Sequence, residues 1–243
     1  MTDTRQDAIR AYYETLFSAW GRQHWWPAQS RFEVIVGAYL TQNTAWTNVE
    51  KALAQLRKAR LLAIAGIRRT PQARLAQLIR SSGYFRQKAD RLKTFVRFLD
   101  KRYGGSLIRM FKHPTTGLRD ELLALDGVGP ETADSILLYA GDHPVFVVDA
   151  YTRRIFERHE IVSRQSSYDD IRKLFEQALG GLPSPQERSD ALPSFERLAP
   201  RLVSPSFACQ QRQTLASGAG FQRDARTHRR SRQDILSKVT TAV

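Results

Sequence analysis

The sequence LDGVGPETADSILLYAGDHPVFVVDAYTRR, residues 125–154, decides the fold and the chemistry that we expect of this chain. A Gly-Val-Gly turn, residues 127–129, separates a helical pattern that ends at Leu125 from a second one that begins directly after the turn. Glycine tolerates positive φ and lets another backbone approach closely, and Pro130 suits the first turn of a helix. The free amides of the turn could therefore face a phosphate oxygen. An ordinary glycine turn explains the same letters, since short glycine motifs are weak indicators.

A buried apolar run, residues 145–148, leads from this second helix to a single carboxylate, Asp149. The pattern predicts that Asp149 stands at the start of a further helix from Ala150 to about Arg158. Asp is a favoured N-cap residue, so a purely structural role competes with a chemical one. At the edge of a cleft, the same carboxylate can also act as a base or face a developing positive charge.

Together these motifs resemble the helix-hairpin-helix and the catalytic aspartate of the endonuclease III superfamily of DNA glycosylases. The resemblance covers roughly residues 20–180. Within this range the sequence is most similar to the bacterial 3-methyladenine glycosylase branch. It implies two helical lobes, with the hairpin and Asp149 in a cleft between them. The upstream sequences that carry it are Trp25-Trp26-Pro27, Leu40-Thr41-Gln42-Asn43-Thr44 and Ser82-Gly83-Tyr84-Phe85-Arg86-Gln87-Lys88-Ala89.

Helical apolar patterns run through most of the chain, and no alternating apolar and polar run indicates a sheet, so the predicted class is all-α. By the resemblance, residues 28–140 form a central helical bundle that includes the helix-hairpin-helix at about 118–140. Residues 1–27 and 141–183 would form a second lobe, which carries Asp149. Ser, Pro, Gln and Arg are frequent in residues 184–243, which predicts a disordered basic tail in place of the patterned helix that family members have. The tail is either an added DNA-binding segment or a stretch translated out of its ancestral frame.

The net charge and the cysteine content limit which partners and cofactors we expect for this chain. Thirty-eight Lys and Arg against 24 Asp and Glu leave a net charge of +14, which suits double-stranded DNA. A single cysteine, Cys209, excludes both an intrachain disulfide and the four-cysteine iron–sulfur cluster of many relatives. We therefore expect no cofactor and no metal site, although the hairpin carbonyls could hold a monovalent cation. The start MTDTRQD is not a secretory signal and no run is apolar enough to span a bilayer, so we expect a cytoplasmic, chromosome-associated monomer without a membrane partner.

Aromatic residues bear on the substrate. Trp25, Trp26 and Pro27 form a rigid patch before the second helix, and Trp46 lies early in the third. A glycosylase takes its base out of the duplex and holds it against apolar or aromatic faces. N-methylated purines such as 3-methyladenine are cationic, and an indole attracts a cation by roughly 0.5 to 2 kcal/mol. Core packing is the commoner role of a single Trp, but the match to the branch assigns these four residues to a base pocket.

Position 131 separates two mechanisms. By the resemblance, bifunctional relatives carry a lysine two residues after the second hairpin glycine, where it forms a Schiff base with the sugar. Glu131 stands at this position, and a carboxylate cannot form an imine, so we expect no AP lyase activity. Asp149 would then stabilise an oxocarbenium-like sugar and orient or deprotonate the attacking water.

Further residues are expected to contact DNA. The resemblance implies that an amide of the pair Gln42 and Asn43 fills the gap left by the extruded base, although helix capping explains this pair equally well. The other expected DNA contacts are the hairpin residues Gly127, Gly129, Glu131 and Thr132 and the basic residues Arg86 and Lys88.

Three functions remain open. The first is a base excision repair glycosylase that hydrolyses the N-glycosidic bond of alkylated purines without lyase activity. The second is an endonuclease III-like glycosylase for oxidised or mismatched bases, and Glu131 disfavours a lyase of that kind. The third is a catalytically weak DNA-binding protein of the same fold, which the intact Asp149 disfavours and the unusual tail favours.

Overall fold

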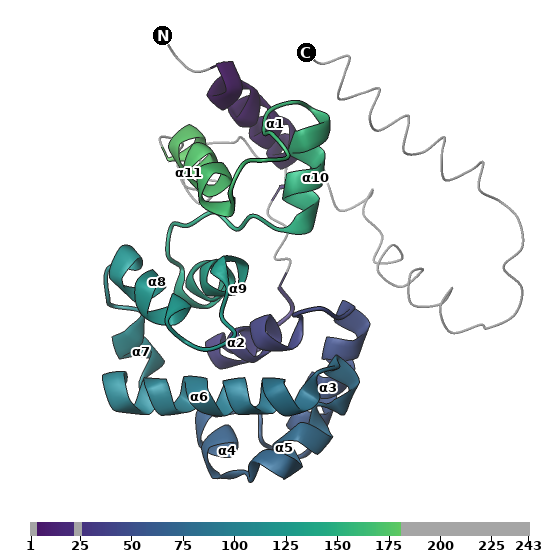
Figure 1. The fold of residues 1–243 in the computed structure, drawn as a ribbon, viewed down its shortest axis with the longest axis vertical. Coiled ribbons are helices and arrows are strands. Elements are labelled where there is room, and N and C mark those ends of the chain that lie inside the picture. Colours follow the sequence, from purple (N-terminus) through teal and green to yellow (C-terminus); the bar gives the residue numbers. More distant parts are fainter. Residues whose placement is uncertain (1–3, 22–25, 181–243) are drawn as a thin grey trace, which may run out of the picture. The chain divides into compact units, whose positions relative to one another are not determined.

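The computed structural model describes residues 4–21 and 26–180, and within these ranges it contains helices and no strand (Figure 1). The all-α class predicted from the sequence is confirmed. Trp25 and the predicted tail, residues 184–243, lie outside the described residues. No helix in the described part of the chain is long and apolar enough to cross a membrane.

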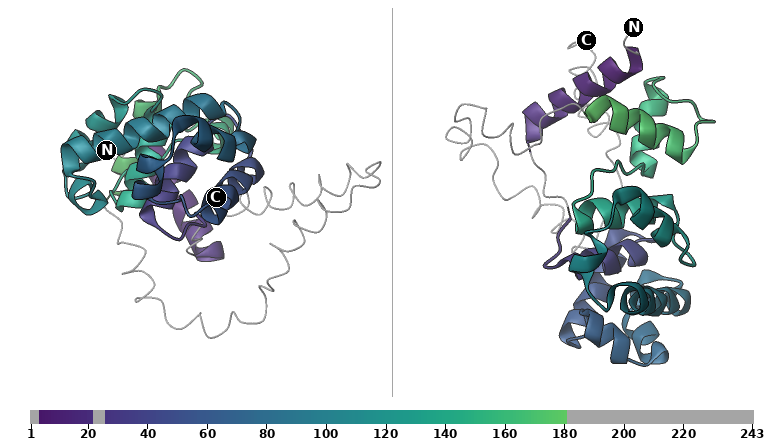
Figure 2. Two further views of the ribbon diagram at one scale, coloured as in Figure 1. Left: turned by 90° about the horizontal axis from the view of Figure 1, so that it is seen from below. Right: turned by 90° about the vertical axis from the view of Figure 1, so that its left-hand side faces the viewer.

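Eleven α-helices follow one another in the described ranges, together with a 3-10 turn (η1) and a π-helical turn (η2). Their bounds are α1 (Thr4–Trp20), α2 (Arg31–Leu40), α3 (Trp46–Lys58), α4 (Ile64–Arg69), α5 (Gln72–Leu78), η1 (Arg80–Ser82), α6 (Phe85–Tyr103), α7 (Leu107–Met110), α8 (Thr115–Leu123), α9 (Pro130–Ser135), η2 (Ile136–Ala140), α10 (Ala150–Arg158) and α11 (Tyr168–Leu179). The helices α1 and α11 come from opposite ends of the described chain and lie side by side (Figure 2).

The larger hydrophobic cluster is built around α2, in which every residue from Phe32 to Leu40 is buried. Its sequence FEVIVGAYL is apolar on all sides, as a helix at the centre of a bundle requires. The one charged residue in that run, Glu33, is buried and forms an ion pair with Arg57 of α3. The long helix α6 contributes an apolar stripe to the same cluster and packs against α2, α4 and α5.

A smaller hydrophobic cluster contains residues from α1, from α11 and from the apolar run before Asp149. Phe146 of that run stacks on Phe175 of α11, with the ring centroids 4.3 Å apart. In α1, by contrast, only Ile9 is buried, and Leu16 and Trp20 are exposed. The smaller hydrophobic cluster therefore rests mainly on α11, and its other buried residues are Ile9 of α1, Val148 of the run before Asp149, and Ile161 and Val162 of the loop after α10.

Candidate functional site

The glycine hairpin lies between α8 and α9, and its two glycines have different roles. Gly127 has φ +72°, the left-handed region that favours glycine, and a Cβ built there would lie 1.9 Å from Arg91 Nε. Gly129 has φ −91° and ψ 174° at the N-cap of α9, with open space around its missing Cβ, and Pro130 begins the helix as predicted. Within the described residues, the N–H groups of Gly127 and Gly129 donate no hydrogen bond. They are available to an anion at the start of α9.

Gln42, in the loop after α2, holds this hairpin through hydrogen bonds of its side-chain amide. Its Nε2 donates to the carbonyl of Gly127 and to Oγ1 of the buried Thr132, at 3.0 Å each, and its Oε1 accepts from Arg91 Nη1 at 3.0 Å. All three contacts engage the side-chain amide of Gln42 inside the protein. Asn43, in contrast, is exposed in a left-handed conformation with φ 53°. Of the two amides, Asn43 is therefore the one placed to reach a ligand.

Asp149 stands at the N-cap of α10, whose bounds agree with the helix expected from the sequence. Its side chain is half-buried, and Oδ1 accepts a hydrogen bond from the backbone N–H of Thr152 at 2.7 Å. Within the described part of the chain, Oδ2 takes no hydrogen bond. One carboxylate oxygen thus fixes the helix, and the other is free for chemistry.

Glu131 and Asp149 are electrostatic neighbours. Glu131 lies in the first turn of α9, and its pKa is raised, first by partial desolvation of the carboxyl group and second by the negative charge of Asp149. The side chain as a whole is nevertheless exposed, so the desolvation is partial. The hairpin helix therefore brings a second carboxylate, and not an amine, towards Asp149.

Three aromatic rings cluster beside the central helix. Trp26 and Trp46 are half-buried and pack edge to face with ring centroids 5.7 Å apart, and Pro27 next to Trp26 is exposed. Tyr139 lies 5.2 Å from Trp26, centroid to centroid. The indole of Trp26 also passes close to Gly37, where a Cβ would lie 3.1 Å from the ring.

Tyr139 was not identified as a site residue from the sequence. It lies in η2, the π-helical turn that directly continues α9, and π-helical turns are frequent at functional sites. The same continuous helical segment therefore carries Glu131 at its start and an aromatic ring near its end. The only signal in the sequence was an aromatic residue in the helix that follows the hairpin.

The expectation that Lys88 contacts DNA is wrong. The side chain is 1% exposed, and Nζ donates to the carbonyls of Leu40 and Ser82 at 2.9 and 2.6 Å. Burial, and then the nearby charge of Arg91, lower the pKa of Lys88 to about 8. Lys88 thus ties the end of α2 to η1 and cannot reach a phosphate. Arg86 is exposed, with its guanidinium 5.9 Å from the ring centre of Phe85.

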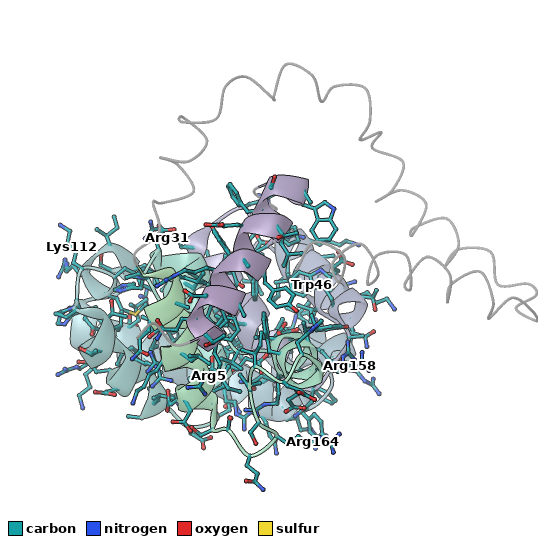
Figure 3. All side chains as sticks on the ribbon, turned by 90° about the horizontal axis from the view of Figure 1, so that it is seen from above. Arg5, Arg31, Trp46, Lys112, Arg158 and Arg164 are labelled. Carbon is teal, nitrogen blue, oxygen red and sulfur yellow. The ribbon has the colours of Figure 1, made fainter. Side chains whose placement is uncertain are left out.

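Exposed basic side chains come from separate elements of the structure (Figure 3). Lys112 follows α7, Arg158 ends α10 and Arg164 lies in the loop before α11. The positive charge is therefore not confined to one helix. A surface of this kind favours a polyanionic ligand over a small one.

The chain matches known proteins over most of the described residues. The model of the family described as HhH-GPD superfamily base excision DNA repair protein matches residues 36–180. A protein of Methanocaldococcus jannaschii named "Putative DNA repair glycosylase" is 44% identical over 180 residues, which are 74% of this chain and 82% of the relative. Endonuclease III of Thermotoga maritima is 34% identical over 134 residues, 52% of this chain and 55% of the relative.

Several solved structures are similar to this chain in fold. The 3-methyladenine DNA glycosylase of H. pylori bound to 1,N6-ethenoadenine has a TM-score of 0.62 and 28% identity, over 82% of this chain and 89% of that one. A non-covalent complex of endonuclease III with DNA has a TM-score of 0.60 and 23% identity, over 71% and 77%, and this likeness supports the fold alone. Because the family model spans more than half of the chain, the protein belongs to the HhH-GPD superfamily of base excision DNA repair proteins and is a DNA glycosylase.

Proposed function

We propose that the protein releases alkylated purines from double-stranded DNA by hydrolysis and does not cleave the strand. The observation that carries this proposal is the carboxylate of Glu131, electrostatically coupled to Asp149, at the position where bifunctional relatives are expected to have a lysine. Without an amine at that place, the covalent imine of a lyase cannot form there. Hydrolysis assisted by Asp149 is the chemistry that remains.

Asp149 suits this chemistry because its two oxygens have different environments. Oδ1 is held by the backbone N–H of Thr152, so the carboxylate is oriented relative to the first turn of α10 before substrate binds. Oδ2 can face the positive charge that develops on the sugar as the glycosidic bond breaks, or orient the water that attacks it. Neither role needs a change in the helix that Asp149 caps.

The rings of Trp26, Trp46 and Tyr139 support an alkylated purine as the substrate. Aromatic faces hold an extruded base, and they attract a cationic methylated purine by roughly 0.5 to 2 kcal/mol more than a neutral one. The similar H. pylori structure is described as a 3-methyladenine DNA glycosylase and is 28% identical. We extend the proposed pocket to Trp25 and Pro27, which adjoin Trp26 in the sequence.

Double-stranded DNA is the proposed partner, bound as by the endonuclease III relative that was solved with DNA. The N–H groups of Gly127 and Gly129 would grip a phosphate, and the exposed Asn43 would fill the gap left by the base. A monovalent cation at the hairpin carbonyls remains a prediction, and the carbonyl of Gly127 already accepts one hydrogen bond from Gln42. We expect the protein to act as a monomer.

A second candidate is the release of oxidised or mismatched bases. The 34% identity with endonuclease III of Thermotoga maritima favours it. The aromatic cluster and Glu131 favour the first candidate, because they suit a cationic base and a reaction without an imine. Base release from duplexes that carry different lesions distinguishes the two candidate functions.

The test is to incubate the purified chain with duplexes that carry 3-methyladenine, 7-methylguanine, thymine glycol or a G·T mismatch, and to measure base release separately from strand cleavage. We expect release of methylated bases without cleavage. Asp149→Asn should lower the rate by about 100-fold or more, since catalysis by a positioned carboxylate contributes about that much. Asn also caps helices well, so α10 should persist. The matched control is Asp142→Asn, which changes an exposed carboxylate paired with Arg31 and should keep full activity.

Three results would contradict the proposal. Strand cleavage with an adduct trapped by borohydride would show that an amine acts despite Glu131. Release of thymine glycol or mismatched thymine in place of methylated purines would establish the second candidate. Tight binding to every duplex without release of any base would leave a DNA-binding protein without catalytic activity.

A further inference from the structure

The extended run that leads to Asp149 has no neighbouring strand in the described structure, yet two of its amides have side-chain partners, besides the Val145 N–H, which donates to the carbonyl of His143. Phe146 N–H donates to Oε1 of Glu176 at 3.0 Å, and Val148 N–H donates to the hydroxyl of Tyr168 at 3.2 Å. Alternate residues of an extended chain direct their amides to the same side. Both acceptors belong to α11, so this helix replaces a strand as the partner of the run.

The hydroxyl of Tyr168 lies beside the negative charge of Asp134 of α9, and burial first and this charge second raise the pKa of Tyr168. Asp134 is fully buried, and an ionised carboxylate only accepts hydrogen bonds. The Tyr168 hydroxyl accepts from the N–H of Val148, and the charge of Asp134 favours the orientation in which the O–H points towards that carboxylate. This half-buried side chain links the hairpin helix to the residue that precedes Asp149.

Arg119 of α8 fixes Asp134 in turn. Its Nε donates to Oδ1 of Asp134 at 2.7 Å and its Nη2 to Oδ2 at 3.2 Å, a bidentate geometry that defines the plane of the carboxylate. The same Nη2 donates to Asp169, the neighbour of Tyr168, at 2.9 Å. Arg119 therefore holds both Asp134 and the start of α11.

We propose that Tyr168 is a positioning residue for Asp149, because its hydroxyl holds the N–H of Val148 directly before that residue. The proposal rests on the proposed hydrolytic role of Asp149. That residue is anchored on its C-terminal side by its own bond to Thr152 N–H, and the bond from Val148 to Tyr168 is the anchor on its N-terminal side. With only one anchor the carboxylate can rotate about the end of α10, away from the position that the reaction requires.

Loss of the Tyr168 hydroxyl should lower the rate of base release and should not change DNA binding. A displacement of about 1 Å at a reacting group can lower a rate by about 100-fold. Removal of one of two anchors should have a smaller effect, so we expect the rate of base release to fall by about tenfold. The Tyr168 hydroxyl forms no hydrogen bond with Gly127 or Gly129 in the described residues. Its removal should therefore leave the glycine amides unchanged, and the affinity for DNA should stay the same.

Tyr168→Phe is the direct test, because it keeps the ring and removes only the hydroxyl. The matched control is Tyr12→Phe, which also removes a hydroxyl from the smaller hydrophobic cluster, in this case one bonded to Nδ1 of His159 at 2.8 Å. The single-turnover rate of 3-methyladenine release from methylated duplex DNA, the Kd for that DNA and the Tm are measured for both. We expect a rate about tenfold lower in Tyr168→Phe alone, with Kd unchanged and a Tm similar to that of Tyr12→Phe.

Hydrogen exchange of the Val148 amide gives a second measurement that does not depend on activity. The exchange rate should rise at least tenfold in Tyr168→Phe and stay unchanged in Tyr12→Phe. Unchanged exchange at Val148, or base release within twofold of the native rate, would overturn the proposal. A native chain that releases no base from any duplex would instead contradict the proposed function, and the exchange rate would then decide by itself whether Tyr168 anchors Val148.

Discussion

A carboxylate can cap a helix and take part in hydrolysis at the same time if its two oxygens divide these roles. Asp149 meets this condition, since Oδ1 binds the N–H of Thr152 and Oδ2 takes no hydrogen bond within the described residues. The capping role that competes with catalysis in the sequence is therefore compatible with it. Capping supplies the fixed orientation that a reacting carboxylate needs.

Lys88 shows how a basic residue can mislead. It stands near the start of α6, where solvated basic residues are common, but it lies four residues before Leu92 on the face that also carries Phe95 and Leu99. Residues four apart share one side of a helix. The helical spacing therefore contained the signal that Lys88 is buried, although charge alone suggested a surface contact.

The buried amine of Lys88 should make stability depend on pH. The pKa of Lys88 is about 8 in the folded protein and 10.5 in an unperturbed lysine. Between these values the unfolded chain binds more protons, so this residue adds stability as the pH rises from 8 to 10.5. Lys88→Met leaves two carbonyls without their donor and should lower the free energy of unfolding at pH 7 by about 1 to 3 kcal/mol. The deficit relative to the native chain should grow between pH 8 and 10.5.

Denaturant unfolding at pH 7, 8, 9 and 10 measures this difference, and Lys51→Met, which removes an exposed lysine, is the control. A deficit that stays constant across the range, or that shrinks with rising pH, would show that Lys88 does not titrate as the burial implies.

At the scale of the elements, local rules predicted the hairpin and its helices well. Gly127 adopts the positive φ expected of a hairpin glycine, and Pro130 begins α9. Both outcomes depend on backbone preferences that act within a few residues. Arg91 and Tyr139, in contrast, reach the site through contacts with distant parts of the chain, and no local pattern marks them.

The two hairpin glycines should respond differently to substitution. Gly127→Ala forces a side chain into the left-handed region and against Arg91, and we expect it to lower the free energy of unfolding by about 1 to 2 kcal/mol. Gly129→Ala has an allowed φ and open space, so its stability should stay within about 0.5 kcal/mol of the native value. Denaturant unfolding of both variants checks this prediction. An equal loss in the two variants would mean that the strain at Gly127 is relieved elsewhere.

At the scale of the whole described chain, two hydrophobic clusters are joined by a few polar side chains. Arg119 of α8 binds Asp134 of α9 beside the larger cluster and Asp169 of α11 beside the smaller one. Arg119 and Asp169 are 50 residues apart in the sequence. Periodicity predicted the helices that carry these residues but could not predict the pairing, because it describes the face of one helix and not its partner.

Arg119 should therefore contribute far more to stability than an arginine in an exposed ion pair. Arg119→Met leaves the carboxylate of Asp134 buried without its guanidinium, and breaking a buried pair in this way lowers stability by about 3 to 5 kcal/mol. Arg68→Met is the matched control, since Arg68 also forms two hydrogen bonds to one carboxylate, Asp100, but both side chains are exposed. Its effect should be much smaller, because solvent screens exposed pairs. Thermal and denaturant unfolding of the two variants decide the question, and similar losses in both would show that Arg119 does not hold the two clusters together.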